Sequence, residues 1–270
     1  MTALKEKISK QVGRCVIQNV GMTQLGFRGL AEEWWLRHLG DVHWQLIADS
    51  VGQNTTVFKD REGRQVYAAF CATEFDQPNP DHVDLGDTLT VKSTLWSAGR
   101  SRLQSIHALM LGDVIVARFR LISTFVCHAE NGVNASISRT MPYLVPVLDP
   151  APDEFAIQTS TAARANRSQK GMSDEKVLIR PCVGTDFNAV GLLYFPSFTR
   201  FFDQTERGLR PLQEWSPVRR RRVLYFRNIE RGEEIFGTPA VGESDGAELW
   251  SVRAGQKKVK KISHCALQRF

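Results

Sequence analysis

Long apolar runs are missing from this sequence, and their absence restricts where the protein can work. The first nine residues are charged and lack the apolar stretch of a secretory signal peptide. No window approaches the roughly 18 consecutive apolar residues that a membrane-spanning helix needs. We therefore expect a soluble, cytoplasmic protein that does not associate with a membrane.

Cysteine pairs and cofactor motifs are also missing. The five cysteines are widely scattered, odd in number and without a C-x-x-C spacing, which argues against a disulfide framework and against a zinc site. The chain has no G-x-x-x-x-G-K-[ST] motif, no G-x-G-x-x-G motif after a strand, no G-x-S-x-G motif and no metal-ligand spacing. We expect reduced, mostly buried thiols and catalysis without a metal or redox cofactor.

Acidic residues are fewer than basic ones, which gives a formal net charge of +6 and a pI of about 9.2. Basic runs at residues 219–222 and 257–261 adjoin strand-like segments, so they also fit the solvated faces and ends of strands. No DNA-binding or RNA-binding signature accompanies them. The charge favours small polyanionic partners, either the phosphates of coenzyme A or an acidic acyl carrier protein, over nucleic acid.

The N-terminal part of the chain reads as one helix followed by several strands. Residues 29–40 show helical spacing of apolar residues and end at Gly40, which suits a helix C-cap. Alternating runs then predict strands at residues 65–72, 88–96, 101–111 and 114–126. Gly112-Asp113, between the last two runs, is a tight hairpin signal.

The C-terminal part repeats this order. It begins with a strand-like segment at residues 176–181, continues with a helix at about 193–207, and ends with strands near 222–229, 234–238, 248–254 and 258–268. The intervening stretch is polar, rich in small residues and aperiodic, which is typical of a linker. The repeated order predicts an α+β tandem double hotdog, in which each unit is an antiparallel sheet wrapped around a central helix. The expected units are residues 1–150 and 175–270, joined by a linker at 151–174.

A turn that leads into an apolar helix, at residues 186–203, carries the clearest functional signal. It resembles the active-site segment of hotdog-fold thioesterases, Asp-x-Asp-x-x-Gly followed by a long aromatic helix. Asn188 stands where those hydrolases carry their working carboxylate. Aligning the two halves places Gly26 opposite Asn188, so neither half has a carboxylate at that position.

A wider resemblance rests on an ordered set of short motifs, at residues 21–22, 40–44, 63–70 and 186–195. Together they are similar to the leinamycin-type bifunctional acyltransferase/decarboxylase family, a double hotdog of polyketide biosynthesis. The resemblance implies decarboxylation of a methylmalonyl-CoA-type thioester and delivery of the acyl group to an acyl carrier protein. It also implies that Tyr67 is the catalytic tyrosine. The helix at residues 29–36 differs from that of the leinamycin enzyme, which suggests a different subfamily.

The residue at position 188 separates hydrolysis from decarboxylation. An asparagine cannot act as a base or nucleophile, and losing a general base typically costs roughly 10²- to 10⁴-fold in rate. It also avoids repelling the carboxylate of a malonyl-type substrate. The Gly191 and Leu192 amides, at the expected helix start, could donate with the Asn188 side chain to the developing enolate oxygen. Asn188 could instead be a simple turn residue.

The sequence leaves the role of Tyr67 open. A phenol with a pKa near 10 is protonated at neutral pH, so a nucleophilic tyrosine would need a cation such as Arg64, Arg28 or His43 nearby. We favour a hydrogen-bond donor, while a tyrosine merely packed on the sheet is the plain alternative.

The remaining candidates are weaker. Asp41 and His43 could both point into one cleft from an extended segment after the first helix, or they could be a capping aspartate and a packed histidine. Asp186 either contacts substrate or anchors the turn through backbone amides.

The expected catalytic residues are therefore Tyr67 and Asn188. The expected substrate-binding residues are Asp186, Gly191, Leu192, His43 and Arg64. The alternatives to a decarboxylating acyltransferase are a hotdog thioesterase or dehydratase on carrier-bound intermediates, and a non-catalytic acyl-CoA-binding or scaffold protein. Acyl-CoA and an acyl carrier protein are the expected partners, and a homodimer is one option for the assembly.

Overall fold

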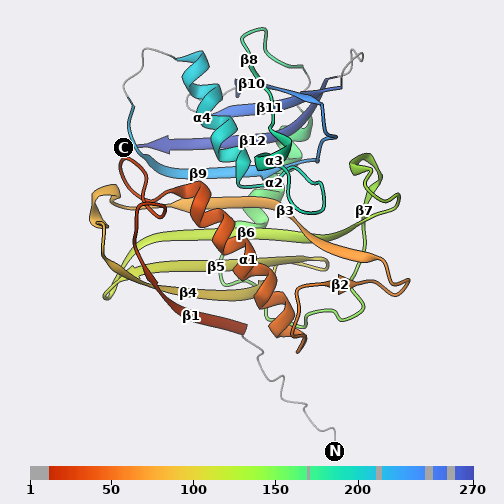
Figure 1. Cartoon of the computed structure of the whole chain (residues 1–270), viewed down its shortest axis with the longest axis horizontal. Helices are drawn as coiled ribbons and strands as arrows, with labels where there is room; N and C mark the ends of the chain where they lie inside the picture. Colours follow the sequence, from red (N-terminus) through yellow and green to blue (C-terminus); the bar gives the residue numbers. More distant parts are fainter. Residues whose placement is uncertain (1–11, 169–170, 211–214, 241–245, 254–258) are drawn as a thin grey trace, which may run out of the picture.

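The computed structural model describes residues 12–168, 171–210, 215–240, 246–253 and 259–270. Within these ranges the strands form one large antiparallel sheet that extends across the molecule (Figure 1). Its strand order is β1-β4-β5-β6-β3-β9-β12-β11-β10-β8, with β2 paired to β3 and β7 paired to β6. The strands are β1 (Val12–Asn19), β2 (Phe58–Lys59), β3 (Gln65–Asp76), β4 (Thr88–Ser97), β5 (Arg102–Leu111), β6 (Val114–His128), β7 (Ile137–Arg139), β8 (Val177–Ile179), β9 (Val218–Tyr225), β10 (Glu234–Pro239), β11 (Ala247–Val252) and β12 (Val259–Arg269).

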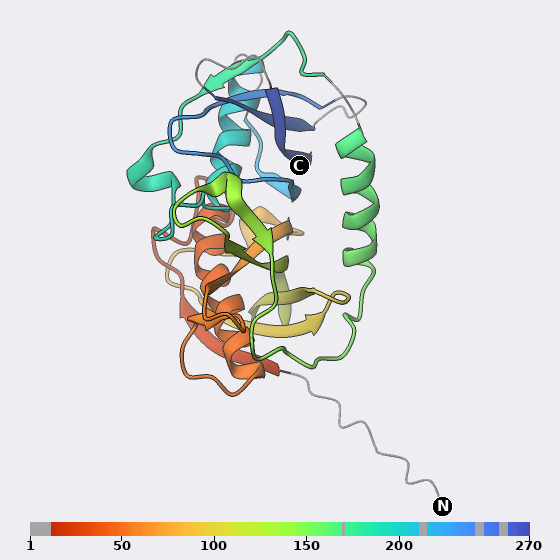
Figure 2. The ribbon, with the colours of Figure 1, turned by 90° about the vertical axis from the view of Figure 1, so that its right-hand side faces the viewer.

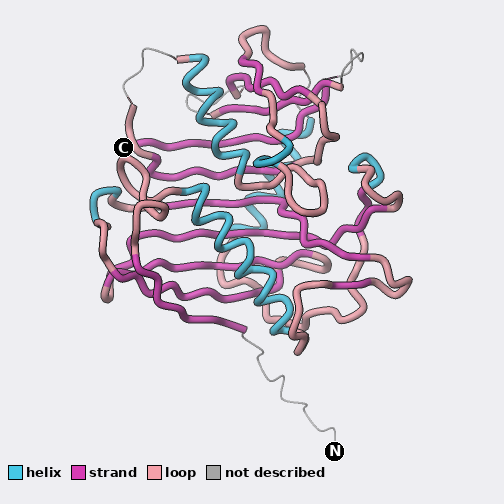
Figure 3. Tube along the Cα trace, in the orientation of Figure 1, coloured by secondary structure: helices cyan, strands magenta, loops and turns pink. Residues whose placement is uncertain are grey.

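Two long helices lie on one face of this sheet, one over each half (Figure 3). They are α1 (Glu32–Ser50), over the N-terminal strands, and α4 (Ser197–Leu209), over the C-terminal strands. The helix α2 (Phe155–Ser168) lies on the opposite face (Figure 2). Three short helices complete the described elements: α3 (Val183–Asp186) and the 3-10 helices η1 (Pro80–His82) and η2 (Asn134–Ser136).

The two halves of the sheet meet where β3 pairs with β9. Residues Ala72 to Asp76 of β3 pair antiparallel with residues Arg220 to Leu224 of β9. On its other side β3 pairs with β6 from Tyr67 to Asp76, with a register shift at Cys71. The strands β3 and β9 are therefore paired only along the C-terminal part of β3, and they separate on the N-terminal side of Cys71.

The basic run at residues 219–222 belongs to β9 and is neutralised within the fold. Arg220 and Arg222 both pair with the buried Glu74 of β3, at 2.8 and 2.7 Å. Arg221 is buried and pairs with Glu32 at 3.0 Å and with Asp203. The expectation of a solvated strand face is wrong for Arg221, which is buried, whereas Arg220 is exposed. Of the second run, Lys257 and Lys258 lie outside the described residues, whereas Lys260 and Lys261 belong to β12, where Lys261 pairs with Glu248 at 2.6 Å.

The first helix continues through Gly40, where the sequence indicates its end. Gly40 has no side chain because the ring of Phe195 occupies that space: a Cβ there would lie 3.0 Å from Phe195 Cε1 and Cζ. The glycine therefore permits a close contact between the two halves of the chain, and α1 runs on to Ser50.

The expected linker contains the helix α2, so the expectation of an irregular segment is wrong for residues 155–168. The division into units at 150 and 175 stays a prediction. The second long helix also begins at Ser197, four residues later than expected, because residues 187–193 form a closed turn.

Candidate functional site

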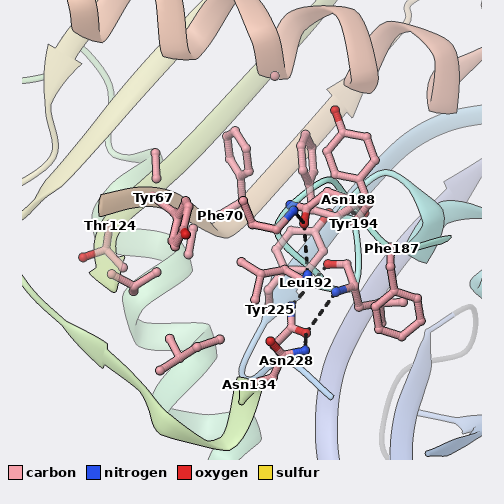
Figure 4. A pocket seen from close by; sticks show the side chains of 18 of the residues that line it. Tyr67, Phe70, Thr124, Asn134, Phe187, Asn188, Leu192, Tyr194, Tyr225 and Asn228 are labelled. Atoms are coloured by element: carbon pink, nitrogen blue, oxygen red, sulfur yellow. Dashed lines mark hydrogen bonds between the residues drawn. The ribbon is translucent and has the colours of Figure 1, made fainter. Parts of the chain in front are cut away.

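A cleft of about 1340 Å³ lies where β3 and β9 separate (Figure 4). Its walls come from α1, β3, β7, the end of α2, the segment 184–195 and the residues that follow β9. Aromatic and aliphatic side chains form much of its surface, among them Trp44, Tyr67, Phe70, Phe187, Leu192, Tyr194, Phe195, Phe198, Tyr225 and Phe226. A largely apolar cleft with a few fixed polar groups is the usual form of a small-molecule site.

The turn at residues 187–193 is held by the Asn188 side chain. Its Oδ1 accepts hydrogen bonds from the Val190 amide at 3.2 Å and from the Leu192 amide at 2.9 Å. The Gly191 amide donates to the Asn188 carbonyl oxygen at 2.9 Å, and Gly191 has a φ of 78° that suits glycine. The expectation that the Gly191 and Leu192 amides are free at a helix start is wrong, because the turn itself uses both donors.

Asn188 nevertheless presents a donor to the cleft. Because its Oδ1 is engaged by two amides, its Nδ2 must point away from them. This Nδ2 has no hydrogen-bond partner within the described part of the chain, and Asn188 lines the cleft. The side chain is therefore both a turn residue and an oriented N–H donor, which combines the two readings of the sequence.

Two asparagines that the sequence did not single out hold this turn in place. The buried Asn134 donates through Nδ2 to the Gly191 carbonyl at 2.8 Å and to the Ile229 carbonyl at 2.7 Å. Asn228 accepts from the Leu193 amide at 2.9 Å and donates back to the Leu193 carbonyl. These partners are tens of residues away along the chain, so no local sequence signal identifies them.

Asp186 is buried and does not line the cleft. Its Oδ2 accepts the Cys182 amide at 2.7 Å, and its Oδ1 pairs with Arg200 of α4. This geometry matches the anchoring role that was weighed for it, and gives no contact with a ligand in the cleft.

Tyr67 lines the cleft from β3. Its hydroxyl makes no hydrogen bond to the described residues, and its ring meets the His128 ring edge-on with centroids 5.7 Å apart. Burial raises the pKa of Tyr67, with a smaller effect from Cys127. The phenol is therefore protonated at neutral pH and can donate a hydrogen bond.

None of the cations proposed to activate Tyr67 is placed to do so. Arg28 is exposed, pairs with Asp81 at 2.6 Å and does not line the cleft. Arg64 is exposed in the turn before β3 and pairs with Asp60 and Glu62. His43 is fully buried beneath α1, where its Nδ1 contacts Ser105 Oγ at 2.8 Å and its Nε2 contacts Ser123 Oγ at 2.7 Å. Burial lowers the pKa of His43 to about 3, so it is neutral. Neither Arg64 nor His43 lines the cleft, because each is held by partners elsewhere.

Asp41 lines the cleft, whereas His43 does not. The two residues lie in a continuous helix, where positions two apart face different directions, so the expected pair from an extended segment does not form. Asp41 is the one carboxylate among the described residues that line the cleft. Burial raises the pKa of Asp41, partly offset by His38.

Tyr194 lines the cleft together with Asp41. Burial, followed by the charge of Asp41, raises the pKa of Tyr194 to about 12. The guanidinium of Arg37 lies 5.0 Å from the centre of the Tyr194 ring and pairs with Glu33 at 2.8 Å. This wall of the cleft thus combines one carboxylate with an arginine that already has an anionic partner.

Metal-binding clusters and membrane-spanning helices are both absent from the part of the chain that the structure describes. No group of three or more His, Cys, Asp or Glu side chains there is arranged to hold a metal ion. No helix in the described ranges is long and apolar enough to cross a membrane.

No protein-family model and no curated protein matches the chain. Solved structures do resemble it. An acyl-ACP thioesterase from Bacteroides thetaiotaomicron has a TM-score of 0.64 and 12% identity, over 94% of this chain and 96% of the other. The 12:0-ACP thioesterase from Umbellularia californica has a TM-score of 0.61 and 13% identity, over 95% and 93% of the two chains. At this identity the likeness establishes the fold alone: a large antiparallel sheet with few helices, of the hotdog-like type of these thioesterases.

Proposed function

We propose that the protein hydrolyses acyl thioesters carried on coenzyme A or on an acyl carrier protein. The observation that carries the proposal is the largely apolar cleft into which Asn188 presents an oriented amide donor. An apolar cleft suits an acyl chain, and a fixed donor suits the oxygen of a thioester. The fold shared with two acyl-ACP thioesterases supports this choice over the decarboxylating reaction.

Three residues take named roles in this reaction. The Asn188 Nδ2 and the Tyr67 hydroxyl donate hydrogen bonds to the thioester oxygen as it gains negative charge. Asp41 takes a proton from water, whose oxygen attacks the carbonyl carbon. The C–S bond then breaks, and the leaving thiolate receives the proton held by Asp41. The raised pKa of Asp41 makes it a stronger base.

We also propose that the chain is a tandem double hotdog. Each half of the sheet carries one long helix on the same face, α1 over the N-terminal strands and α4 over the C-terminal strands. The β3 and β9 strands join the two halves edge to edge. This arrangement places the cleft at the junction, so both halves contribute to its walls.

A second candidate is the decarboxylating acyltransferase of the leinamycin type. One observation favours it: the residue in the turn is an amide, and its free N–H can stabilise an enolate without supplying a base. In this reaction the C–C bond to the substrate carboxylate breaks, CO₂ leaves, and the enolate carbon is protonated. The acyl group then moves from the coenzyme A sulfur to the carrier thiol.

The experiment that separates these candidates supplies the protein with acyl-CoA and acyl-carrier thioesters of increasing chain length, and separately with methylmalonyl-CoA plus carrier. Free thiol and free acid from the first set support hydrolysis. A carrier that gains the mass of a propionyl group, without free acid, overturns it in favour of the second candidate. Tight binding of thioesters with no turnover overturns both, and leaves a binding or scaffold protein.

Variants test the roles. Asp41→Asn should lower kcat by roughly 10²- to 10⁴-fold. Tyr67→Phe should lower it by roughly 10²-fold. Asp49→Asn, on the same helix but paired with Arg14 outside the cleft, and Tyr143→Phe, an exposed tyrosine, are the matched controls. Wild-type hydrolysis by Asp41→Asn would refute its role as the base.

A further inference from the structure

The cleft reaches both faces of the sheet. On the N-terminal side of Cys71, β3 no longer pairs with β9, so the two strands move apart and leave this edge of β3 free. Phe70 packs with Phe195 on the face that carries α1. Cys71 packs with Phe155 and other residues of α2 on the opposite face. Both Phe70 and Cys71 line the cleft, which therefore passes along this free edge from one face to the other.

The two ends of this passage differ in charge. The end at α1 holds Asp41 and Arg37, and Arg37 is already paired with Glu33. The end at α2 is lined by Arg139 of β7 and Arg167 of α2, both exposed. Neither makes an ion pair with any residue that the structure describes. No carboxylate lines that end among the described residues.

These arginines are held at the passage by the fold. The Arg167 guanidinium lies 5.3 Å from the centre of the Phe226 ring, and Arg139 is the last residue of β7, opposite Val126 of β6. Both are close to Cys71: burial raises the pKa of that thiol, and the charges of Arg102, Arg139 and Arg167 offset part of this effect. Arg102 itself donates to Ser160 of α2 and does not line the cleft. Arg227 also lines the cleft, but its Nε donates to the Asn228 carbonyl oxygen at 3.2 Å, whereas the side chains of Arg139 and Arg167 make no hydrogen bond to the described residues.

From this arrangement we infer that Arg139 and Arg167 bind the phosphate of a pantetheine arm, which enters the sheet from the α2 face and delivers its thioester to the aromatic end at α1. Guanidinium groups bind phosphate through paired, charge-assisted hydrogen bonds. The inference rests on the proposed function, since a pantetheine thioester is the substrate that it orients. It adds the direction of entry and the residues that recognise the phosphate.

The test compares three thioesters with one acyl group: acyl-CoA, acyl-carrier protein, and acyl-pantetheine, which has no phosphate. The double variant Arg139→Gln/Arg167→Gln should lower kcat/KM for acyl-CoA by about tenfold to hundredfold per guanidinium. It should leave acyl-pantetheine unchanged. Arg164→Gln, which removes an arginine of the same helix that does not line the cleft, is the matched control.

Each outcome has a meaning. A loss for both acyl-CoA and acyl-carrier assigns the site to the phosphate that the two arms share, whereas a loss for acyl-CoA alone assigns it to the nucleotide phosphates of coenzyme A. An equal loss for acyl-pantetheine, or no loss for any substrate, overturns the inference.

Calorimetry separates this inference from the proposed function, because it needs no turnover. Coenzyme A should bind the wild-type protein at least tenfold more tightly than pantetheine does, and the double variant should abolish that difference. If no thioester is hydrolysed but this difference is found, the reaction is wrong and the phosphate site stands. Equal binding of the two compounds by wild type refutes the site.

Discussion

Gly40 is the position where adding one methyl group tests the contact between the two halves of the protein. In an isolated helix, Gly40→Ala should stabilise the folded state by about 0.8–1.0 kcal/mol, because alanine is the better helix former. In this protein the new Cβ would lie 3.0 Å from Cε1 and Cζ of Phe195. The sign of the effect therefore depends on whether the Phe195 ring can move.

The surroundings of Phe195 leave it little room. Its ring lies 4.0 Å from the centre of Phe70, and its other neighbours include Tyr194 and Tyr225, with ring centres at 5.4 and 6.2 Å. Forcing an extra carbon into a well-packed core typically costs about 1–3 kcal/mol. Subtracting the gain in helix propensity leaves a net loss of about 1 kcal/mol for Gly40→Ala.

The assay is urea unfolding of wild type, Gly40→Ala, Phe195→Leu and the double variant. Once the ring is replaced by the smaller leucine, Gly40→Ala should stabilise by about 1 kcal/mol, so the coupling energy should be about 2 kcal/mol. Gly184→Ala, where a Cβ meets nothing within 4 Å, should not destabilise. A Gly40→Ala protein that is about 1 kcal/mol more stable than wild type would refute the packing argument.

Three further results follow from the same structure. Lowering the pH from 7.5 to 5.5 should reduce the free energy of unfolding by about 1.4 kcal/mol through His43. The pKa of His43 is about 3 in the folded protein and lies below its unfolded value, so the stability that neutral His43 contributes is lost as the pH falls below about 6.5. The measurement is the free energy of unfolding of wild type and of His43→Gln at both pH values. Asn134→Ala should destabilise by about 2–3 kcal/mol, because the carbonyls of Gly191 and Ile229 lose their donor, as thermal unfolding would show. Asn188→Asp should fold normally, because a carboxylate oxygen can accept the same two amides. It should lower thioester hydrolysis by roughly 10²-fold, because the variant replaces the amide donor to the thioester oxygen with a carboxylate, and it should weaken malonyl-CoA binding by repelling the substrate carboxylate; an unchanged rate and affinity would show that position 188 does not face the substrate.

The strands of the N-terminal half could be predicted because their signal is local. Alternation of apolar and polar residues marks β4 to β6, and Gly112, with a φ of 57°, makes the hairpin between β5 and β6. Tyr67 and Asn188 both line one cleft, although nothing in their local sequence places them together.

The elements that sequence reasoning missed have weak or misleading local signals. β1 is an edge strand with mostly exposed side chains, so it lacks the alternation of a half-buried strand. The face of α2 that packs on the sheet is built largely from small residues, including Ala156, Ala162 and Ala163, and small residues hide a helical pattern. Gly40 gives a misleading signal, because a glycine after a helical pattern predicts a helix end. In the structure this glycine makes room for Phe195, 155 residues later, and the sequence alone cannot show that contact.

The parts of the cleft come from both halves of the chain, and this has a functional consequence. Asp41 and Tyr67 belong to the N-terminal half, while the turn of Asn188 belongs to the C-terminal half. That turn is fixed in part by Asn134, which reaches from the N-terminal half to the Gly191 carbonyl. Position 188 needs only an acceptor for the turn and a donor for the cleft, and an asparagine supplies both. In the proposed hydrolysis the base, Asp41, comes from the other half, so neither half alone would hold a complete site.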